Sequence, residues 1–203
     1  GVYIFEGHLD HEALEYAFSM LLERHESLRT IFKEDEQGEV KQFIYSPEES
    51  GFTIRYQDLR NKEGQEELVK RIVQQEATKP FDLASGPLLR AGLIQVADTK
   101  WVFTYVMHHI ISDGWSMDIL IKEILLLYNA YTTGENNPLI PLRIQYKDYA
   151  AWQQEQLSGE ALKLHKDYWL KQFEGELPVL ELPGDKVRPA VKTYNGGVIN
   201  KRI

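Results

Sequence analysis

Cysteine is absent from this 203-residue sequence, and its absence excludes disulfide bonds and thiolate catalysis. A chain without cysteine fits a cytoplasmic protein. The sequence also lacks an excess of positive charge, because 23 Lys and Arg residues face 31 Asp and Glu residues and give a net charge of −8. The charges are spread along the chain, which argues against nucleic acid or an anionic membrane as a partner.

Long apolar runs are missing as well. The run over residues 119–127 is interrupted by Lys122 and Glu123, so no segment approaches the length of a membrane span. No signal peptide is visible, and the sequence begins at Gly1 inside a strand-like run, so we expect a truncated N-terminus. The length and a hydrophobic content of 43% fit one domain with a real core or two small domains.

Hydrophobic periodicity predicts strands interleaved with helices. Helices are predicted over residues 11–25 (with Asp10 as N-cap), 64–78, 116–132, 146–157 and 160–173. The first helix is predicted to have one apolar face, formed by Ala13, Leu14, Ala17, Phe18, Leu21 and Leu22. Strands are predicted over residues 2–5, 28–32, 40–44, 52–56, 88–96 and 101–107. The acidic turn at residues 35–38 predicts a hairpin between the strands at 28–32 and 40–44. Such interleaving predicts an α/β sandwich with a mixed sheet. The segment after residue 174 is rich in Pro and Gly and is typical of a connector.

The strongest chemical signal lies in residues 107–116, where a predicted strand ends in two adjacent histidines, His108 and His109. A polar turn with Asp113 and Gly114 follows, and a helix begins. The spacing His-His-x-x-x-Asp-Gly arises by chance about once in a million positions. A purely structural interpretation stays open, in which one histidine ends the strand and Asp113 caps the helix. No metal is expected, because the spacing of metal ligands and a third ligand are missing.

Successive side chains of a strand point to opposite faces, so His108 and His109 are expected to do different jobs. If one faces a cleft, the other belongs to a wall, where it is neutral and hydrogen-bonded to backbone.

This stretch resembles the His-His-x-x-x-Asp-Gly signature of the condensation domains of nonribosomal peptide synthetases, which belong to the chloramphenicol-acetyltransferase-like superfamily. Residues 24–32 resemble the family's Arg-His-Glu-x-Leu-Arg-Thr-x-Phe motif, and residues 146–152 resemble its Tyr-x-Asp-Tyr-Ala-x-Trp motif. The three motifs come in the family's order, and the resemblance spans essentially the whole chain.

The resemblance implies a chloramphenicol-acetyltransferase-like two-layer sandwich lobe, with a mixed β-sheet flanked by helices. Residues 1–174 would be the N-terminal lobe of a V-shaped domain, and residues 175–203 a linker toward an absent C-terminal lobe. The family's first motif, Ser-x-Ala-Gln-x-Arg, would lie before Gly1. Its later motifs would lie in the absent lobe, so the isolated lobe is expected to be inactive.

The resemblance also implies chemistry. His109 would face a tunnel where an acyl or peptidyl thioester on an upstream donor carrier protein meets an aminoacyl amine on a downstream acceptor carrier protein. Each substrate is held by the phosphopantetheine arm of its carrier, and no cofactor is expected to bind this chain directly. The expected reaction is amide formation, with His109 as a base or as a hydrogen-bonding positioner. The sequence leaves these two roles open.

Four residues are expected to support His109. The resemblance implies a salt bridge between Asp113 and Arg29 that fixes the loop, whereas Arg24 is expected to be an exposed cation at a helix end. Gly114 either leaves room for the acceptor amine or simply permits a turn. His108 is assigned to structure. A further expectation, from helical spacing alone, is that the aromatic stripe at positions 146, 149 and 152 packs into the core.

Other functions stay open. An epimerisation domain usually differs after Asp-Gly, whereas Trp115-Ser116-Met117 resembles the condensation form. A heterocyclisation domain has aspartate where this chain has His108. A coenzyme A-dependent acyltransferase is harder to separate, because the distinction lies partly in the absent lobe. A non-catalytic module that docks carrier proteins is the remaining alternative. The expected partners are the two carrier proteins, the absent lobe and neighbouring synthetase domains.

Overall fold

The computed structural model describes residues 1–180, 183–184 and 189–191. The chain forms two compact units, Gly1–Glu155 and Gln156–Ile203. A boundary between lobe and linker after residue 174 stays a prediction. Within the described residues, no helix combines the length and the apolar character that crossing a membrane requires.

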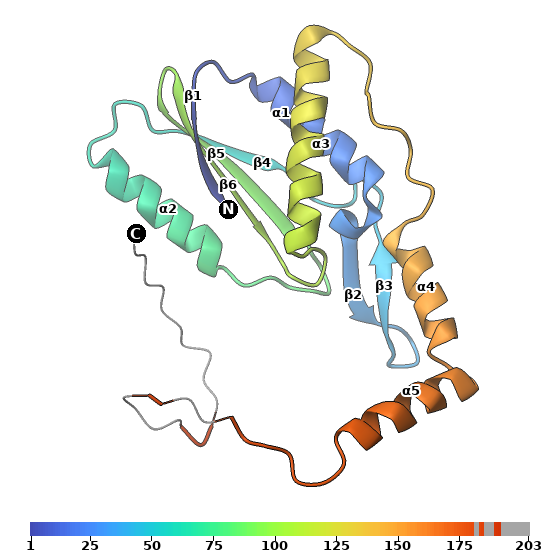
Figure 1. Ribbon diagram of the computed structural model, residues 1–203. Helices are drawn as coiled ribbons and strands as arrows, with labels where there is room; N and C mark the ends of the chain where they lie inside the picture. The colour runs from blue at the N-terminus through green and yellow to red at the C-terminus, as the bar shows by residue number, and fades with distance from the viewer. Residues whose placement is uncertain (181–182, 185–188, 192–203) are drawn as a thin grey trace. The chain divides into compact units, whose positions relative to one another are not determined.

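Strands and helices interleave as predicted, which confirms the α/β class (Figure 1). The helices are α1 (His11–Arg24), the 3-10 helix η1 (Glu26–Arg29), α2 (Gln65–Thr78), α3 (Gly114–Thr133), α4 (Tyr146–Gln156) and α5 (Gly159–Gln172). The strands are β1 (Val2–Glu6), β2 (Thr30–Glu34), β3 (Val40–Ile44), β4 (Ile54–Asp58), β5 (Leu89–Ala97) and β6 (Lys100–Met107).

The main sheet has the strand order β1-β6-β5-β4. Strand β6 pairs antiparallel with β1 and β5, whereas β4 pairs parallel with β5, so the predicted mixed sheet is confirmed. Strands β2 and β3 form a separate antiparallel hairpin, as predicted from the turn between them.

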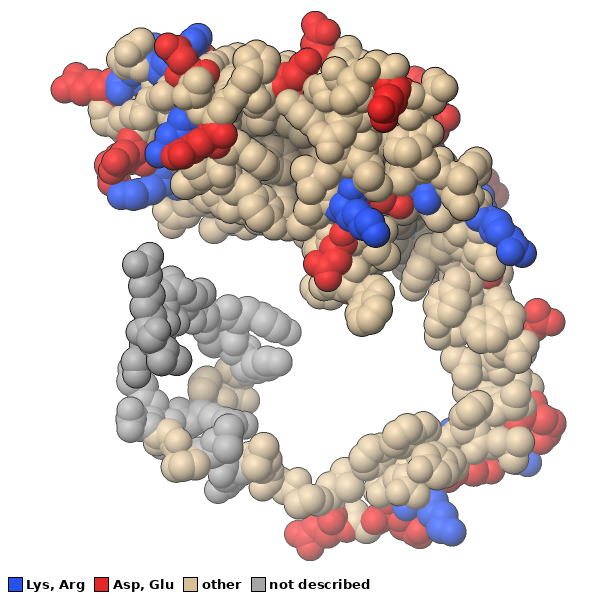
Figure 2. Space-filling model, turned by 45° about the horizontal axis from the view of Figure 1, so that its top comes forward, with Lys and Arg blue, Asp and Glu red and all other residues tan. Residues whose placement is uncertain are grey.

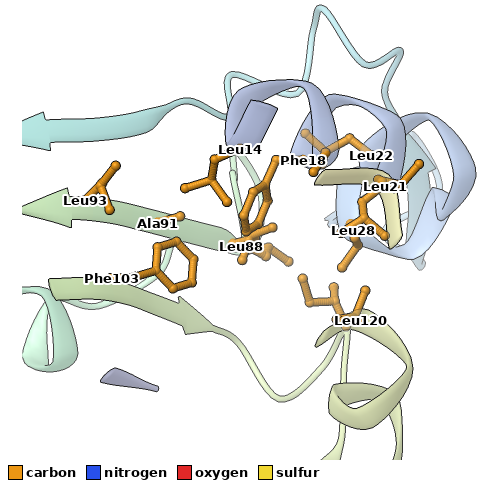
Figure 3. Close-up of a cluster of buried hydrophobic side chains, with 14 of the residues drawn as sticks. Leu14, Phe18, Leu21, Leu22, Leu28, Leu88, Ala91, Leu93, Phe103 and Leu120 are labelled. Atoms are coloured by element: carbon orange, nitrogen blue, oxygen red, sulfur yellow. The ribbon is translucent and has the colours of Figure 1, made fainter. Parts of the chain in front are cut away.

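Alternation along β5 and β6 assigns each face of the sheet to different helices. Leu89, Leu93 and Phe103 belong to the buried cluster that α1 and α3 complete, whereas Arg90 and Val106 lie on the opposite face beside α2. Figure 3 shows the cluster, where side chains of α1 lie beside those of β5, β6 and α3. The six α1 residues predicted to face inward are all buried: Ala13, Leu14, Ala17, Phe18, Leu21 and Leu22.

Two expectations about local structure were wrong. The strand predicted from residue 28 begins at Thr30, because residues 26–29 form η1. The aromatic stripe of α4 is not core: Tyr146, Tyr149 and Trp152 are 56%, 43% and 55% exposed. Their rings instead contact one another, with centroid distances of 5.9 and 5.7 Å. Helical spacing shows that the three residues share a face, but burial also requires a partner surface.

Candidate functional site

The turn between β6 and α3 presents the paired histidines. The backbone N–H of His108 donates to the carbonyl of Leu88 (2.9 Å), which continues the β5–β6 pairing one residue past the strand. The N–H of Ile111 donates back to the carbonyl of His108 (3.1 Å), and the Ile111 side chain is buried. The turn is therefore tied to the sheet at one end and to the core at the other.

His108 is half-buried. Its Nδ1 accepts a hydrogen bond from the backbone N–H of Ile110 (3.1 Å), so Nδ1 carries no proton. Its ring meets Phe81 edge-on, at a centroid distance of 5.8 Å and an interplanar angle of 88°. These contacts agree with the structural role expected for His108, which stays a prediction.

His109 is exposed and lines an open recess. Turn, sheet and helix residues share this recess, namely Gly1, Ala77, Tyr105, Val106, Met107, Ser112, Asp113, Gly114 and Met117. The ring is therefore accessible to a molecule entering the recess. An imidazole there can accept or donate a hydrogen bond or a proton.

Asp113 is the N-cap of α3. Its carboxylate accepts hydrogen bonds from the backbone N–H (2.8 Å) and the hydroxyl (2.7 Å) of Ser116. These hydrogen bonds, the hydroxyl's first, lower the pKa of Asp113 below its usual 3.8, and His109 contributes a smaller electrostatic effect. The interpretation of Asp113 as a helix cap, which the sequence left open, is confirmed.

The expected salt bridge between Asp113 and Arg29 is wrong. Arg29 donates from Nε to the carbonyl of Leu22 (2.8 Å) and from Nη1 to the carbonyl of Tyr45. In the described part of the chain no ion pair joins Arg29 to Asp113. The guanidinium finds carbonyl partners near the end of α1 and just after β3, while Ser116 already satisfies Asp113.

Arg24 is not the exposed cation that was expected. Its Nε lies 3.1 Å from Oε1 of Glu123 on α3, and its side chain is 14% exposed. Oε2 of the same carboxylate lies 2.6 Å from Nε2 of His25. Sequence reasoning missed this cluster, although a carboxylate interrupting an apolar run at Glu123 was a usable signal.

The same region joins two of the motif stretches. Gln145 donates from Nε2 to the carbonyl of Arg24 (2.9 Å), and Lys147 pairs with Glu26 at 2.7 Å. The stretch before α4 is therefore bound to the end of α1, which Glu123 binds to α3. These contacts hold α3 and the start of α4 against the end of α1.

Gly114 is the first residue of α3, and its φ lies outside the left-handed region. A turn therefore does not require glycine here. A Cβ at this position would meet no atom within 4 Å, so the space beside the backbone is open. Room for an acceptor amine at Gly114 stays a prediction.

Acidic and basic side chains are interspersed on the surface. On the face shown in Figure 2, Lys and Arg side chains lie among Asp and Glu side chains. Among the described residues, no cluster of three or more His, Asp or Glu side chains is placed to hold a metal ion.

Comparison with known proteins gives one family. The family model for the condensation domain matches residues 1–203. The chain is 46% identical over 195 residues to a plipastatin synthase protein of Bacillus subtilis (strain 168), covering 96% of this chain and 5% of that protein. It is also 46% identical over 192 residues to a linear gramicidin synthase protein of Brevibacillus parabrevis, covering 94% of this chain and 4% of that protein.

Solved structures agree with these relatives. The X-domain from teicoplanin biosynthesis superposes with a TM-score of 0.76 at 29% identity, over 94% of this chain and 41% of that one. An epimerization domain from the third module of a tyrocidine synthetase gives a TM-score of 0.77 at 25% identity, over 93% of this chain and 42% of that one. The chain thus spans less than half of each similar structure.

Proposed function

This chain belongs to the condensation-domain family, and we propose that it supplies half of a site for peptide-bond formation within an intact domain. The observation that carries the proposal is the exposed His109 imidazole, held at the end of β6 in an open recess. The substrates would be an acyl or peptidyl thioester and an aminoacyl amine, each on the phosphopantetheine arm of a carrier protein. The peptide synthases among the relatives support this substrate class.

The reaction balances without a cofactor in this chain. The amine nitrogen attacks the thioester carbonyl, a C–N bond forms, and the C–S bond breaks to release the donor's thiolate. The proton that the amine loses passes to that thiolate. His109 takes part either by accepting this proton in transit or by hydrogen-bonding the amine so that it points at the carbonyl.

The turn supports His109 from both sides. His108 is fixed by the N–H of Ile110, and Asp113 is fixed by Ser116, so the residues flanking His109 have little freedom. Arg29 supports the site at a distance, by binding the end of α1 to the segment after β3. Gly114 would leave space for the acceptor amine beside the first turn of α3.

The test uses the intact domain that contains this chain, with loaded donor and acceptor carrier proteins. Removal of a general base lowers the rate about 10²–10⁴-fold, and we expect His109→Ala to fall in this range. His8→Ala, which changes an exposed histidine outside the recess, is the matched control and should keep the full rate. Normal condensation by His109→Ala would remove this residue from the reaction.

The second candidate is a module that docks a protein without catalysis. One observation favours it: the chain also matches a complex of the X-domain and OxyB from teicoplanin biosynthesis, with a TM-score of 0.78 at 30% identity over 94% of this chain. The same assay separates the candidates. Product from the intact domain supports catalysis, whereas carrier binding without product supports docking.

A further inference from the structure

Phe81 lies next to His108 and Arg90 lies next to Phe81, both outside the three motif stretches. Phe81 belongs to the loop between α2 and β5, and Arg90 is the second residue of β5. The Arg90 guanidinium carbon lies 3.8 Å from the centroid of the Phe81 ring, and the same ring meets His108 edge-on at 5.8 Å. The three side chains therefore form a continuous series of contacts from β5 to the histidine turn.

Arg90 is held in one orientation by the C-terminal end of α2. Its Nη2 donates to the carbonyls of Glu76 (3.0 Å) and Lys79 (2.7 Å), and its Nη1 donates to the carbonyl of Pro80 (3.3 Å). Its Nε lies 3.5 Å from the Glu76 carboxylate, and only 12% of the side chain is exposed. A planar guanidinium bound in this way has a fixed face, and Phe81 packs against that face.

The Phe81 loop is also fixed from its other end. The carbonyl of Leu83 accepts from the backbone N–H of Phe32 on β2 (2.8 Å). The Asp82 carboxylate accepts from the N–H of Ala84 and the hydroxyl of Ser85, both at 2.9 Å. Because the backbone on both sides of Phe81 is bound, its ring offers a rigid surface to His108.

The orientation of His108 has a chemical consequence. Its Nδ1 accepts from the N–H of Ile110, so the neutral ring must carry its proton on Nε2. Rotation of the ring breaks this hydrogen bond and frees the N–H of Ile110, the residue directly after His109. The ring orientation of His108 thus determines whether this hydrogen bond of the turn can form.

We propose that Phe81 and Arg90 are positioning residues that fix the ring plane and the Nε2–H tautomer of His108, and with them the turn that presents His109. The proposed effect of Phe81 and Arg90 on the tautomer of His108 rests only on the contacts described above. The effect on rate rests on the proposed function. Simple packing does not require an aromatic ring at position 81 or a planar cation at position 90, so shape-conserving variants separate the two roles.

The first experiment is histidine side-chain NMR on the chain labelled with ¹⁵N-histidine, where two-bond ¹H–¹⁵N correlations distinguish protonated from unprotonated ring nitrogens. The His108 signals are assigned with His108→Gln. We expect a single Nε2–H tautomer in the wild type and in Phe81→Tyr, and a mixture of tautomers in Phe81→Leu and Arg90→Lys. Phe43→Leu, at a ring that contacts Lys33, is the matched control and should leave the His108 signals unchanged.

The second experiment measures condensation by the intact domain with loaded carriers. We expect Phe81→Leu to lower kcat about tenfold without changing KM, and Phe81→Tyr to restore it. A single unchanged tautomer in folded Phe81→Leu and Arg90→Lys overturns the proposal. A mixed tautomer with an unchanged kcat overturns the positioning role. If the wild-type domain makes no product while the tautomer changes as expected, the proposed function fails and the effect on tautomer stands.

Discussion

Oε2 of Glu123 on α3 lies 2.6 Å from Nε2 of His25 at the end of α1. The other oxygen of this carboxylate pairs with Arg24, and Glu123 itself is buried on the stripe that also includes Leu120 and Leu127. One acidic residue therefore joins the two helices that cover the core face of the sheet, at a position where an apolar residue would otherwise pack.

Replacing this carboxylate should destabilise the chain. Glu123→Gln keeps the shape but leaves the Arg24 charge unpaired and largely buried, and we expect a loss of about 3 kcal/mol in the free energy of unfolding. Urea denaturation measures this loss. Glu67→Gln is the control, because Glu67 pairs with Lys70 on the exposed surface of α2 and should cost less than about 0.5 kcal/mol. Equal losses in the two variants would show that the buried cluster contributes no more to the free energy of unfolding than a surface ion pair does.

Arg29 should stabilise the fold by donating to backbone carbonyl groups rather than by pairing with Asp113. Arg29→Met leaves the carbonyls of Leu22 and Tyr45 without their donor, and we expect a loss of about 1–3 kcal/mol measured by urea denaturation. In a double-mutant cycle with Asp113→Asn, the two effects should add, because the side chains share no partner. A coupling energy well beyond additivity would show that Arg29 and Asp113 form an ion pair after all, and would contradict the prediction.

The helix cap at Asp113 predicts a pH dependence. Hydrogen bonds from Ser116 lower the pKa of Asp113 from 3.8, so the folded-state pKa lies below that of the unfolded chain. The ionised cap therefore stabilises the fold above pH 3.8, and this contribution is lost as the pH falls through the folded-state pKa. We expect Asp113→Ala to lower Tm at neutral pH, with a difference from wild type that shrinks in acid. Asp113→Asn is the control, since an amide caps without titrating. A difference in Tm between wild type and Asp113→Ala that stays constant at all pH values would contradict the prediction.

Two leucines of α3, Leu125 and Leu127, should contribute very different amounts to the free energy of unfolding. Leu127 is fully buried, whereas Leu125 is 52% exposed. We expect Leu127→Ala to cost about 2–5 kcal/mol, because it removes buried methyl groups and leaves a cavity between α1 and α3. Leu125→Ala should cost less than about 1 kcal/mol. Thermal or urea unfolding of both variants measures the difference, and similar losses would mean that α3 packs through another face.

Much of the fold was predictable because the relevant signals are local. The inward face of α1 follows from apolar spacing, and Asp10 was predicted as its cap from its place before that face. The β2–β3 hairpin follows from the turn between the two strands. The paired histidines could be located because a strand pattern ends at Met107 and a helix pattern begins a few residues later.

Within the site, contacts between residues close in sequence could be predicted, whereas contacts between distant segments could not. Asp113 and Ser116 are three residues apart, and their capping arrangement is the kind of relationship that sequence reasoning can reach. The partners of Arg29 and of Glu123 lie on other elements; the partner expected for Arg29 was wrong, and no partner was predicted for Glu123. Phe81 and Arg90 carried no sequence signal that connected them to His108.

The sequence by itself determined the order of the elements, the buried face of α1 and the position of the histidine turn, because hydrogen bonding and apolar spacing act between residues a few positions apart. Only the tertiary structure decided which partner each charged side chain takes and which aromatic face stays exposed. These outcomes depend on surfaces brought together from distant parts of the chain, where several partners are chemically equivalent and geometry alone selects one.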